Sequence, residues 1–342
     1  MFDPLFTVFG LEVRPFSLCA CAAAFAAVSL FLCLGAKRNY PRNALEKCAL
    51  AAVPLAVFCG HLLFCVVLWN DVIPSYGWRI LTEPRQGGFM FYGAAAGAAG
   101  AVFFAGRRYR KPFFDLTALS LLTVILCLRF AEPLDGQGHG INVDDFPAVH
   151  FFPIAFPNPE WPDEWNLAVF FWEGLYALGV LVFLLLTLKK RAPGDTALTA
   201  LILYAAGQVI FESLRRDEVV RWLFVRVSQL ISALILASVV ILAIIRGARG
   251  RRGAVLMGLT LLFIGAIIAL EFAVEKPLLL PGHEPIYFSL PLTYSLITLC
   301  AFGLGAVAMT AKGAFFPNKT DGKGALPCVR FLPSVFPSAS PR

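Results

Sequence analysis

The chain has 342 residues, of which 58% are hydrophobic and 15% are charged, and its formal net charge is +7. A soluble domain has about 25% charged residues, so this composition excludes a water-soluble globular protein and indicates a polytopic membrane protein. In that class an excess of basic residues belongs to cytoplasmic loops, and we expect no nucleic-acid partner. The histidines and cysteines show no zinc-ligand spacing, so we expect no metal.

Nine apolar runs approach the length of about 20 residues that a helix needs to cross the hydrocarbon core. They cover residues 16–36, 48–69, 88–106, 116–131, 166–188, 197–213, 222–245, 254–273 and 286–311. The fourth run is short and contains Arg129, and the sixth ends at Glu212. The first run follows acidic as well as basic residues, which predicts no cleavable signal.

Every second loop between these runs is basic. The basic loops follow the first, third, fifth, seventh and ninth runs, and they begin at Lys37, Arg107, Lys189, Arg246 and Lys312. The positive-inside rule then places the N-terminus outside and the C-terminus inside, in agreement with an odd number of spans.

The stretch Gly87–Gly100, in the third run, carries glycines and alanines along one helix face. Such a face lets another backbone approach closely in a membrane. Packing alone is the simpler interpretation, and the alternative is a helix beside a functional site. Tyr92 is the one polar side chain at its entrance, either as a hydrogen-bond donor or as a proton acceptor.

Two outer segments are too polar to span. Residues 132–165 carry seven acidic residues and no Lys or Arg, together with six prolines. They predict an outward excursion with a short helix on the membrane surface. Residues 70–87, with Trp69, Tyr76 and Trp78 nearby, predict an interfacial segment. The proline- and serine-rich tail after Lys312 predicts disorder.

Ionisable groups at membrane depth are costly and are candidates for function. The candidates gather at the outer side and are Arg129, Glu173, Glu212, Arg215, Arg216 and Arg221. The planar guanidinium suits phosphate, and a phospholipid headgroup lies at this depth. The alternative is that Arg129 and Arg215 pair with Glu173 or Glu212 and hold helices together.

Five polar side chains lie in or at the ends of the apolar runs. Glu173 and Glu212 either orient an arginine or accept a proton. Gln208 and Gln229 predict hydrogen bonds between helices. His61 lies in mid-helix, where a buried structural histidine is the favoured interpretation over a catalytic one.

These motifs resemble the prolipoprotein diacylglyceryl transferase family. Val8–Phe16 is similar to the family's entry into its first helix, and Gly87–Gly97 to its Gly-Gly-x-x-Phe-His/Tyr-Gly-Gly-x-x-Gly segment. Glu212-Ser213-Leu214-Arg215 resembles its Glu-Phe-x-Arg helix end, and Val227–Ser232 the Ser-x-Gly-Gln-x-x-Ser of its last helix. The resemblance covers about residues 5–245.

The chain departs from the family signature Gly-Arg-x-Gly-Asn-Phe-x-Asn-x-Glu at Leu128–Gln137. Arg129 matches the arginine, whereas the asparagines are replaced by Glu132 and Asp135 and the glutamate by Gln137. The family's Leu-Tyr-Glu reads Phe171-Trp172-Glu173. Two further family arginines correspond to His61 and Gln208.

The resemblance implies an all-α membrane protein with a seven-helix core, followed here by two extra helices. It divides the chain into a transferase core at 1–246, an additional helix pair at 247–312 and a cytoplasmic tail at 313–342. The implied location is the bacterial plasma membrane.

The implied activity is transfer of a diacylglyceryl group from phosphatidylglycerol to the lipobox cysteine of a prolipoprotein, without a cofactor. Tyr92, Arg129 and Arg215 are the expected catalytic residues. The expected phosphatidylglycerol-binding residues are Arg129, Gln137, Glu173, Glu212, Arg215, Arg216 and Gln229. The substituted signature motivates one alternative, an inactive lipid-binding homologue. A transporter or channel with an anion path is a further alternative, although no helix shows a Gly/Pro break with midplane charges.

Overall fold

The computed structural model describes residues 5–8, 11–82, 88–158, 161–216, 221–222, 225–248, 250–275 and 289–316. It is an all-α polytopic membrane protein, as expected. Eight helical segments have at least 18 residues and are apolar enough to cross a membrane. Their helices are α1 (Pro15–Lys37), α2 (Arg42–Val67), α5 (Arg110–Ala131), α6 (Val169–Thr187), α7 (Asp195–Leu214), α8 (Val227–Arg246), α9 (Arg251–Glu275) and α10 (Leu290–Lys312).

Two of the expected spans have different lengths in the structure. The third run forms α4 (Phe91–Ala105), whose 15 residues reach about 22 Å at 1.5 Å each, short of a core of about 30 Å. The fourth run is not short, because α5 begins at Arg110 and has 22 residues. Its polar start is stable inside the protein because Asp115 accepts the backbone N–H groups of Gly194 and Ala197, each at 2.7 Å.

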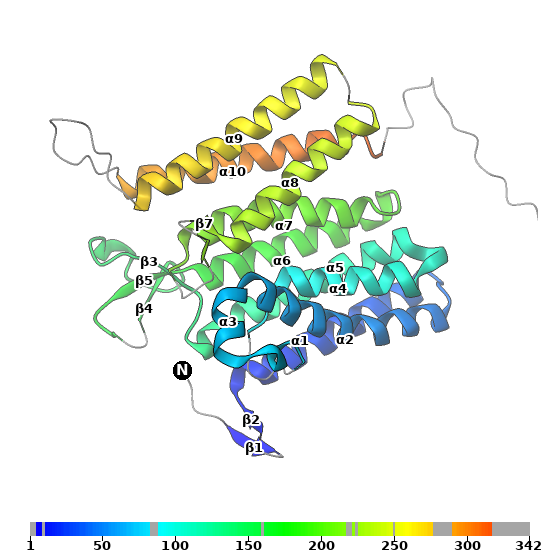
Figure 1. Cartoon of the computed structure of the whole chain (residues 1–342), viewed down its shortest axis with the longest axis horizontal. Helices are drawn as coiled ribbons and strands as arrows, with labels where there is room; N and C mark the ends of the chain where they lie inside the picture. The colour runs from blue at the N-terminus through cyan, green and yellow to red at the C-terminus, as the bar shows by residue number, and fades with distance from the viewer. Residues whose placement is uncertain are drawn as a thin grey trace, which may run out of the picture.

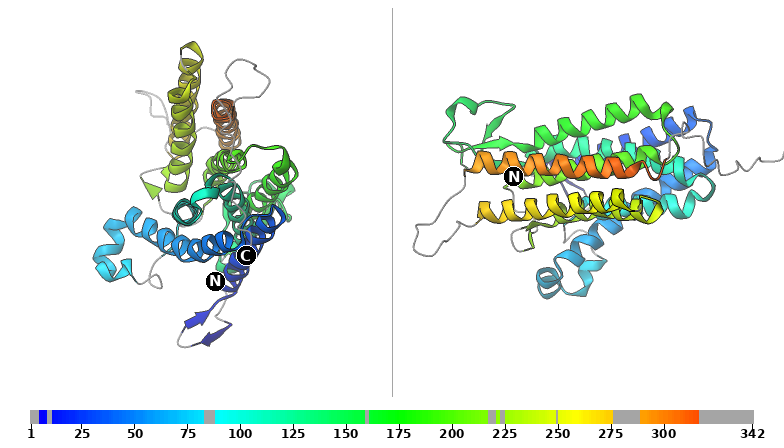
Figure 2. Two further views of the ribbon diagram at one scale, coloured as in Figure 1. Left: turned by 90° about the vertical axis from the view of Figure 1, so that its right-hand side faces the viewer. Right: turned by 90° about the horizontal axis from the view of Figure 1, so that it is seen from above.

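The long helices lie roughly side by side in one bundle (Figure 1). α1 packs on α2 and α5, and α5 in turn packs on α6 and α7. The last two helices lie on the opposite side of the bundle from α1 and α2 (Figure 2), and α10 contacts α7, α8 and α9. The added pair shares an apolar core with α7 and α8, in which Leu236 and Leu304 are fully buried.

The glycines of α4 bring it against α2. A Cβ atom at Gly93 would overlap the backbone carbonyl of Cys59, and one at Gly97 would overlap that of Leu55, whereas one at Gly100 would meet nothing within 4 Å. The close-packing interpretation is therefore confirmed for Gly93 and Gly97. Gly87 lies outside the described residues.

The segment 132–165 forms a small sheet, so the expected surface helix is wrong. Its strands are β3 (His139–Asn142), β4 (Ala155–Pro157) and β5 (Trp165–Ala168), in the antiparallel order β3-β5-β4. Short 3-10 helices flank them at η3 (Glu132–Asp135) and η4 (Pro147–Val149). The prolines explain the difference, since each removes an N–H donor that a helix would need.

The remaining described elements are short. α3 (Trp69–Tyr76) and the 3-10 helix η1 (Trp78–Leu81) form the segment expected at the interface, and η2 (Arg107–Tyr109) and η5 (Leu188–Lys190) precede basic turns. Two hairpins pair β1 (Phe6–Val8) with β2 (Leu11–Val13) and β6 (Arg221–Trp222) with β7 (Val225–Arg226). The tail from residue 317 onward lies outside the described residues.

Candidate functional site

Two arginines and two glutamates meet at the end of the bundle that carries the β3–β5 sheet. Arg129 lies in the last turn of α5, Glu132 in η3, Glu173 in the second turn of α6 and Arg215 directly after α7. Glu173 contacts Nε of Arg129 at 2.6 Å and Nη1 of Arg215 at 3.3 Å. Glu132 contacts Nη2 of Arg215 at 2.5 Å and also pairs with Arg129. Each carboxylate therefore bridges both guanidinium groups.

Three residues of this cluster are buried, and the side chain of the fourth, Arg129, is 16% exposed. Arg215 is 4% exposed and Glu173 is 1% exposed. Charges so far from water are retained only when they are paired and hydrogen-bonded, and the shared carboxylates satisfy this condition. The side-chain amide of Gln208 also donates to Glu173.

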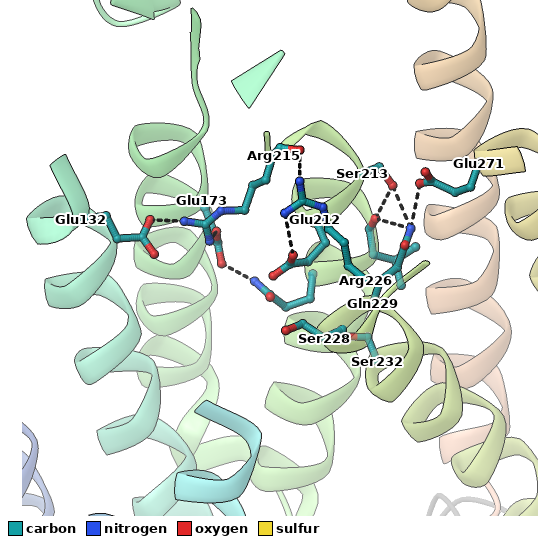
Figure 3. A network of polar contacts seen from close by, with 12 residues as sticks. Glu132, Glu173, Glu212, Ser213, Arg215, Arg226, Ser228, Gln229, Ser232 and Glu271 are labelled. Carbon is teal, nitrogen blue, oxygen red and sulfur yellow. Dashed lines mark hydrogen bonds and ion pairs between the residues drawn. The ribbon is translucent and has the colours of Figure 1, made fainter. Parts of the chain in front are cut away.

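A second group of charges continues the network on the far side of α7. Arg226, at the start of α8, lies 3.7 Å from the carboxylate of Glu212 and donates to the backbone carbonyl of Arg215. Figure 3 shows Arg226 between Arg215 and Glu212. The carbonyl of Arg215 is thereby held in place by another arginine, at the end of β7.

The amide of Gln229 on α8 joins three helices. It donates to Oγ of Ser213 on α7 and to Oε1 of Glu271 on α9, each at 2.9 Å. Glu271 reaches Gln229 from a separate helix (Figure 3). Arg129, Arg215 and Arg226 thus lie in one set of polar contacts with Glu132, Glu173 and Glu212, and the contacts of Gln229 with Ser213 and Glu271 form a second group on the same helices.

Tyr92 lies in the first turn of α4, and its hydroxyl is 2.5 Å from Oγ of Ser232 on α8. Ser232 lies 2.7 Å from the carbonyl of Ser228, to which it donates. Since a serine hydroxyl has one proton, Tyr92 is the donor toward Ser232. Its ring lies 6.0 Å from that of Tyr204 on α7.

The remaining expected residues lie around this network. Arg216 is exposed, donates to the hydroxyl of Tyr294 on α10, and has its guanidinium 5.9 Å from the centre of that ring. Gln137 is exposed in the turn after η3, and no described side-chain contact joins it to Arg129 or Arg215. Arg221 lies in β6, but its side chain is outside the described residues.

His61 is a buried structural histidine, as its position in the sequence favours. It is buried on α2, and its ring nitrogens lie 2.6 Å from the carbonyl of Ile80 and 3.2 Å from that of Gly88. It therefore connects α2 to the segment between α2 and α4, away from the arginine cluster.

Sequence analysis gave no site role to Glu132, Arg226 or Glu271. The sequence spacing could have predicted the pairing of Glu132 with Arg129, because a residue three positions after Arg129 at a helix end lies on the same face. Arg226 is a further arginine on the outer side, against the positive-inside pattern. Glu271 is a carboxyl group near the outer end of an otherwise apolar helix.

Chemically, the arrangement suits an anionic lipid headgroup. A guanidinium has five N–H donors in a planar fork, and the described contacts of Arg129 use Nε and Nη1. A phosphate can be bound beside the carboxylates that orient these forks. In a site with little water, such fixed positive charge stabilises negative charge that develops on a leaving group.

Comparisons with known proteins agree with this chemistry. The family model described as prolipoprotein diacylglyceryl transferase matches residues 4–245. Curated relatives are the phosphatidylglycerol–prolipoprotein diacylglyceryl transferases of Clostridium novyi, 26% identical with 70% of this chain and 93% of the relative covered, and of Streptococcus mutans, 26% identical with 72% and 96% covered. That of Geobacillus kaustophilus is 27% identical, with 63% and 81% covered.

Proposed function

The chain belongs to the prolipoprotein diacylglyceryl transferase family, and we propose that it transfers the diacylglyceryl group of phosphatidylglycerol to the cysteine thiol of a prolipoprotein. It is a membrane-embedded enzyme of the transferase class. The observation that carries the proposal is the pair Arg129 and Arg215, which share the buried carboxylates of Glu132 and Glu173 within the matched region.

Arg129 and Arg215 are proposed to hold the phosphate of phosphatidylglycerol. The lipid's phosphodiester carries one negative charge, and breaking its bond to the diacylglyceryl carbon leaves a second on glycerol phosphate. Both guanidinium groups are already fixed by carboxylates, so little reorganisation is needed when this charge develops. Glu173 and Glu132 act as positioning residues. Arg216, Glu212, Gln229 and Gln137 complete the proposed lipid-binding set.

The reaction forms one bond and breaks one. The cysteine sulfur attacks the glyceryl carbon, a C–S thioether bond forms, and the C–O bond to phosphate breaks with departure of glycerol phosphate. The thiol proton ends on the departing glycerol phosphate, so that atoms and charge balance. Tyr92 is the proposed group near the reacting centre, and its donor bond to Ser232 favours an orienting role over a proton-accepting one.

The proposed topology places the N-terminus outside, the C-terminus inside, and the arginine cluster at the outer leaflet of the bacterial plasma membrane. Contacts among the basic ends support a common inner side. Arg38, after α1, donates to the carbonyl of Leu188 after α6, and Lys312 of α10 pairs with Asp195 at the start of α7. We propose residues 1–246 as the transferase core, 247–312 as an added helix pair and 313–342 as a cytoplasmic tail.

The test uses purified full-length protein, phosphatidylglycerol vesicles and a lipobox peptide. We expect a mass increase of one diacylglyceryl group on the peptide cysteine, absent when that cysteine is replaced by serine. An inactive outcome with phosphatidylglycerol still bound, and lost in Arg129→Ala, would favour the lipid-binding homologue. Anion flux into liposomes without transfer would favour a channel or transporter.

A further inference from the structure

The two C-terminal helices lie outside the residues that match the family, yet each one sends a polar side chain to a residue of the proposed lipid-binding set. Glu271 of α9 accepts from the amide of Gln229 at 2.9 Å. Tyr294 of α10 accepts from the guanidinium of Arg216. The remaining contact between the pair and the core is largely apolar, through residues such as Leu304 and Ala308 against α7 and α8.

The apolar contact by itself does not require a carboxyl group. A carboxyl on a membrane helix costs free energy unless it is satisfied, and Leu or Met at position 271 would pack without that cost. Glu271 is nevertheless 8% exposed and directed to Gln229. The polar contact with Gln229, and not packing, therefore explains why a carboxyl group stands at this position.

The bond to Glu271 fixes the orientation of the Gln229 side chain. The amide nitrogen of Gln229, a donor, lies 2.9 Å from Oγ of Ser213 and from Oε1 of Glu271, and 3.4 Å from the carbonyl of Val209. Ser213 and Val209 both belong to α7, so Glu271 is the described acceptor that holds the amide toward α9. Without Glu271 the amide keeps its contacts with α7 and loses its contact with α9.

Tyr294 plays a corresponding part for Arg216. None of the described ion pairs gives Arg216 a carboxylate partner, in contrast to Arg129 and Arg215. Its exposed guanidinium lies 5.9 Å from the centre of the Tyr294 ring and donates to the hydroxyl. A cation held over an aromatic ring keeps its charge available to an anion while its long side chain is ordered.

We propose that α9 and α10 are part of the lipid-binding site, with Glu271 and Tyr294 as positioning residues for Gln229 and Arg216. The inference rests on the proposed function, because it takes these two core residues to contact phosphatidylglycerol. The added pair then sets the affinity for the anionic headgroup and leaves the chemical step to the core.

The first experiment is a double-mutant cycle in the full-length chain. Glu271→Leu is expected to weaken phosphatidylglycerol binding and raise its KM about tenfold, the size of one lost hydrogen bond to a charged group, with kcat within about twofold of wild type. In a Gln229→Leu background the same change should have little further effect. Glu271→Gln retains an acceptor oxygen and should restore most of the affinity.

The matched control on α9 is Thr260→Val. Thr260 is 1% exposed, and among the described residues its hydroxyl bonds to the carbonyl of Leu256 in its own helix, so its loss disturbs α9 without touching the contacts of Glu271. Equal effects of Thr260→Val and Glu271→Leu on lipid affinity would overturn the inference. An undiminished effect of Glu271→Leu in the Gln229→Leu background would do the same.

The second experiment uses α10. Tyr294→Phe keeps the ring and removes the hydroxyl, and it should weaken phosphatidylglycerol binding severalfold in the wild type but not in Arg216→Gln. Ser295→Ala is the control, since Ser295 is exposed and bonds to Pro291 of its own helix. Equal losses of affinity in Tyr294→Phe and Ser295→Ala would contradict the proposal.

Direct binding separates this inference from the proposed function. Retention of phosphatidylglycerol over phosphatidylcholine is measured by native mass spectrometry on every variant, whether or not transfer occurs. A wild type that binds phosphatidylglycerol without transferring it contradicts the proposed function, while the two cycles still decide the inference. A wild type that neither binds nor transfers overturns both.

Discussion

The two ends of α7 each hold a buried cluster of charges, and the clusters differ in what their charges contact. At the end that the proposed topology places inside, called the inner end, Asp195 pairs with Arg191 at 3.0 Å and with Lys312 at 2.5 Å, and Thr199 receives a bond from each cation. Beside them Asp115 accepts the N–H groups at the start of α7. Each of these bonds closes a helix end or ties one helix to its neighbour.

The outer cluster has a different composition. Arg129 and Arg215 share two carboxylates from separate elements, and Arg226 bonds to a backbone carbonyl. The outer cluster therefore holds three guanidinium groups, more than are needed to join these helices by ion pairs. Arginines withdrawn from water are expensive, and we propose that the inner cluster serves folding and the outer cluster binds an anion.

The strongest test of this comparison is to replace one arginine by lysine at each end of α7. Arg215→Lys keeps the charge but cannot bridge Glu132 and Glu173, so transfer should fall by about 100-fold or more. Arg191→Lys retains a single point charge toward Asp195, and its rate should stay within about threefold. The measurement is diacylglyceryl transfer to a lipobox peptide per mole of folded protein. Equal losses at both ends would remove the distinction.

A change in α4 tests how much the outer end depends on backbone packing. Gly97→Ala would force α4 away from the carbonyl of Leu55 on α2 and should lower stability by about 1–3 kcal/mol. Because α4 carries Tyr92, the transfer rate should fall as well. The matched control is Gly100→Ala, which meets nothing within 4 Å and should be neutral or slightly stabilising. Thermal midpoints in detergent and transfer rates measure both effects, and a destabilised Gly100→Ala would contradict the explanation.

A smaller change probes the inner end. Asp115→Asn replaces one acceptor oxygen by a donor facing the N–H groups of Gly194 and Ala197, so it should cost about 1–2 kcal/mol, in the range of a lost helix cap. Transfer per folded molecule should be unchanged. Ser120→Ala, also buried on α5, is the control. Thermal unfolding in detergent reports the first effect, and a specific loss of activity in Asp115→Asn would assign the inner end a functional role.

The smallest effect is expected in the outer sheet. The backbone N–H of Trp165 and the amide of Asn142 bond to Asp144 and lower the pKa of this exposed carboxyl. Because the folded pKa lies below the unfolded one, the contribution to stability is present above about pH 4 and is lost as the pH falls through the folded value. Hydrogen exchange of the sheet amides should therefore differ between wild type and Asp144→Asn at neutral pH, and this difference should shrink in acid. A difference that persists in acid would exclude the carboxylate as the cause.

The sequence by itself determined the membrane class, the approximate positions of the apolar helices, and the gathering of Arg129 and Arg215 with Glu173 at one side. Hydropathy and loop charge are local properties, because the bilayer requires an apolar run of fixed length wherever the chain crosses. The close contact at Gly93 and Gly97 follows from the same kind of signal, since small residues spaced along a helix indicate close packing.

The tertiary structure decided which polar groups meet. Glu132 is 83 residues from Arg215, and Tyr92 is 140 residues from Ser232. These partners meet only when the helices pack in one precise arrangement, and no local sequence pattern determines that arrangement. The outer sheet, the bond of Arg226 to the carbonyl of Arg215, and the contacts of Glu271 and Tyr294 with the core have the same origin. They arise because each buried polar group must find a partner in the packed bundle.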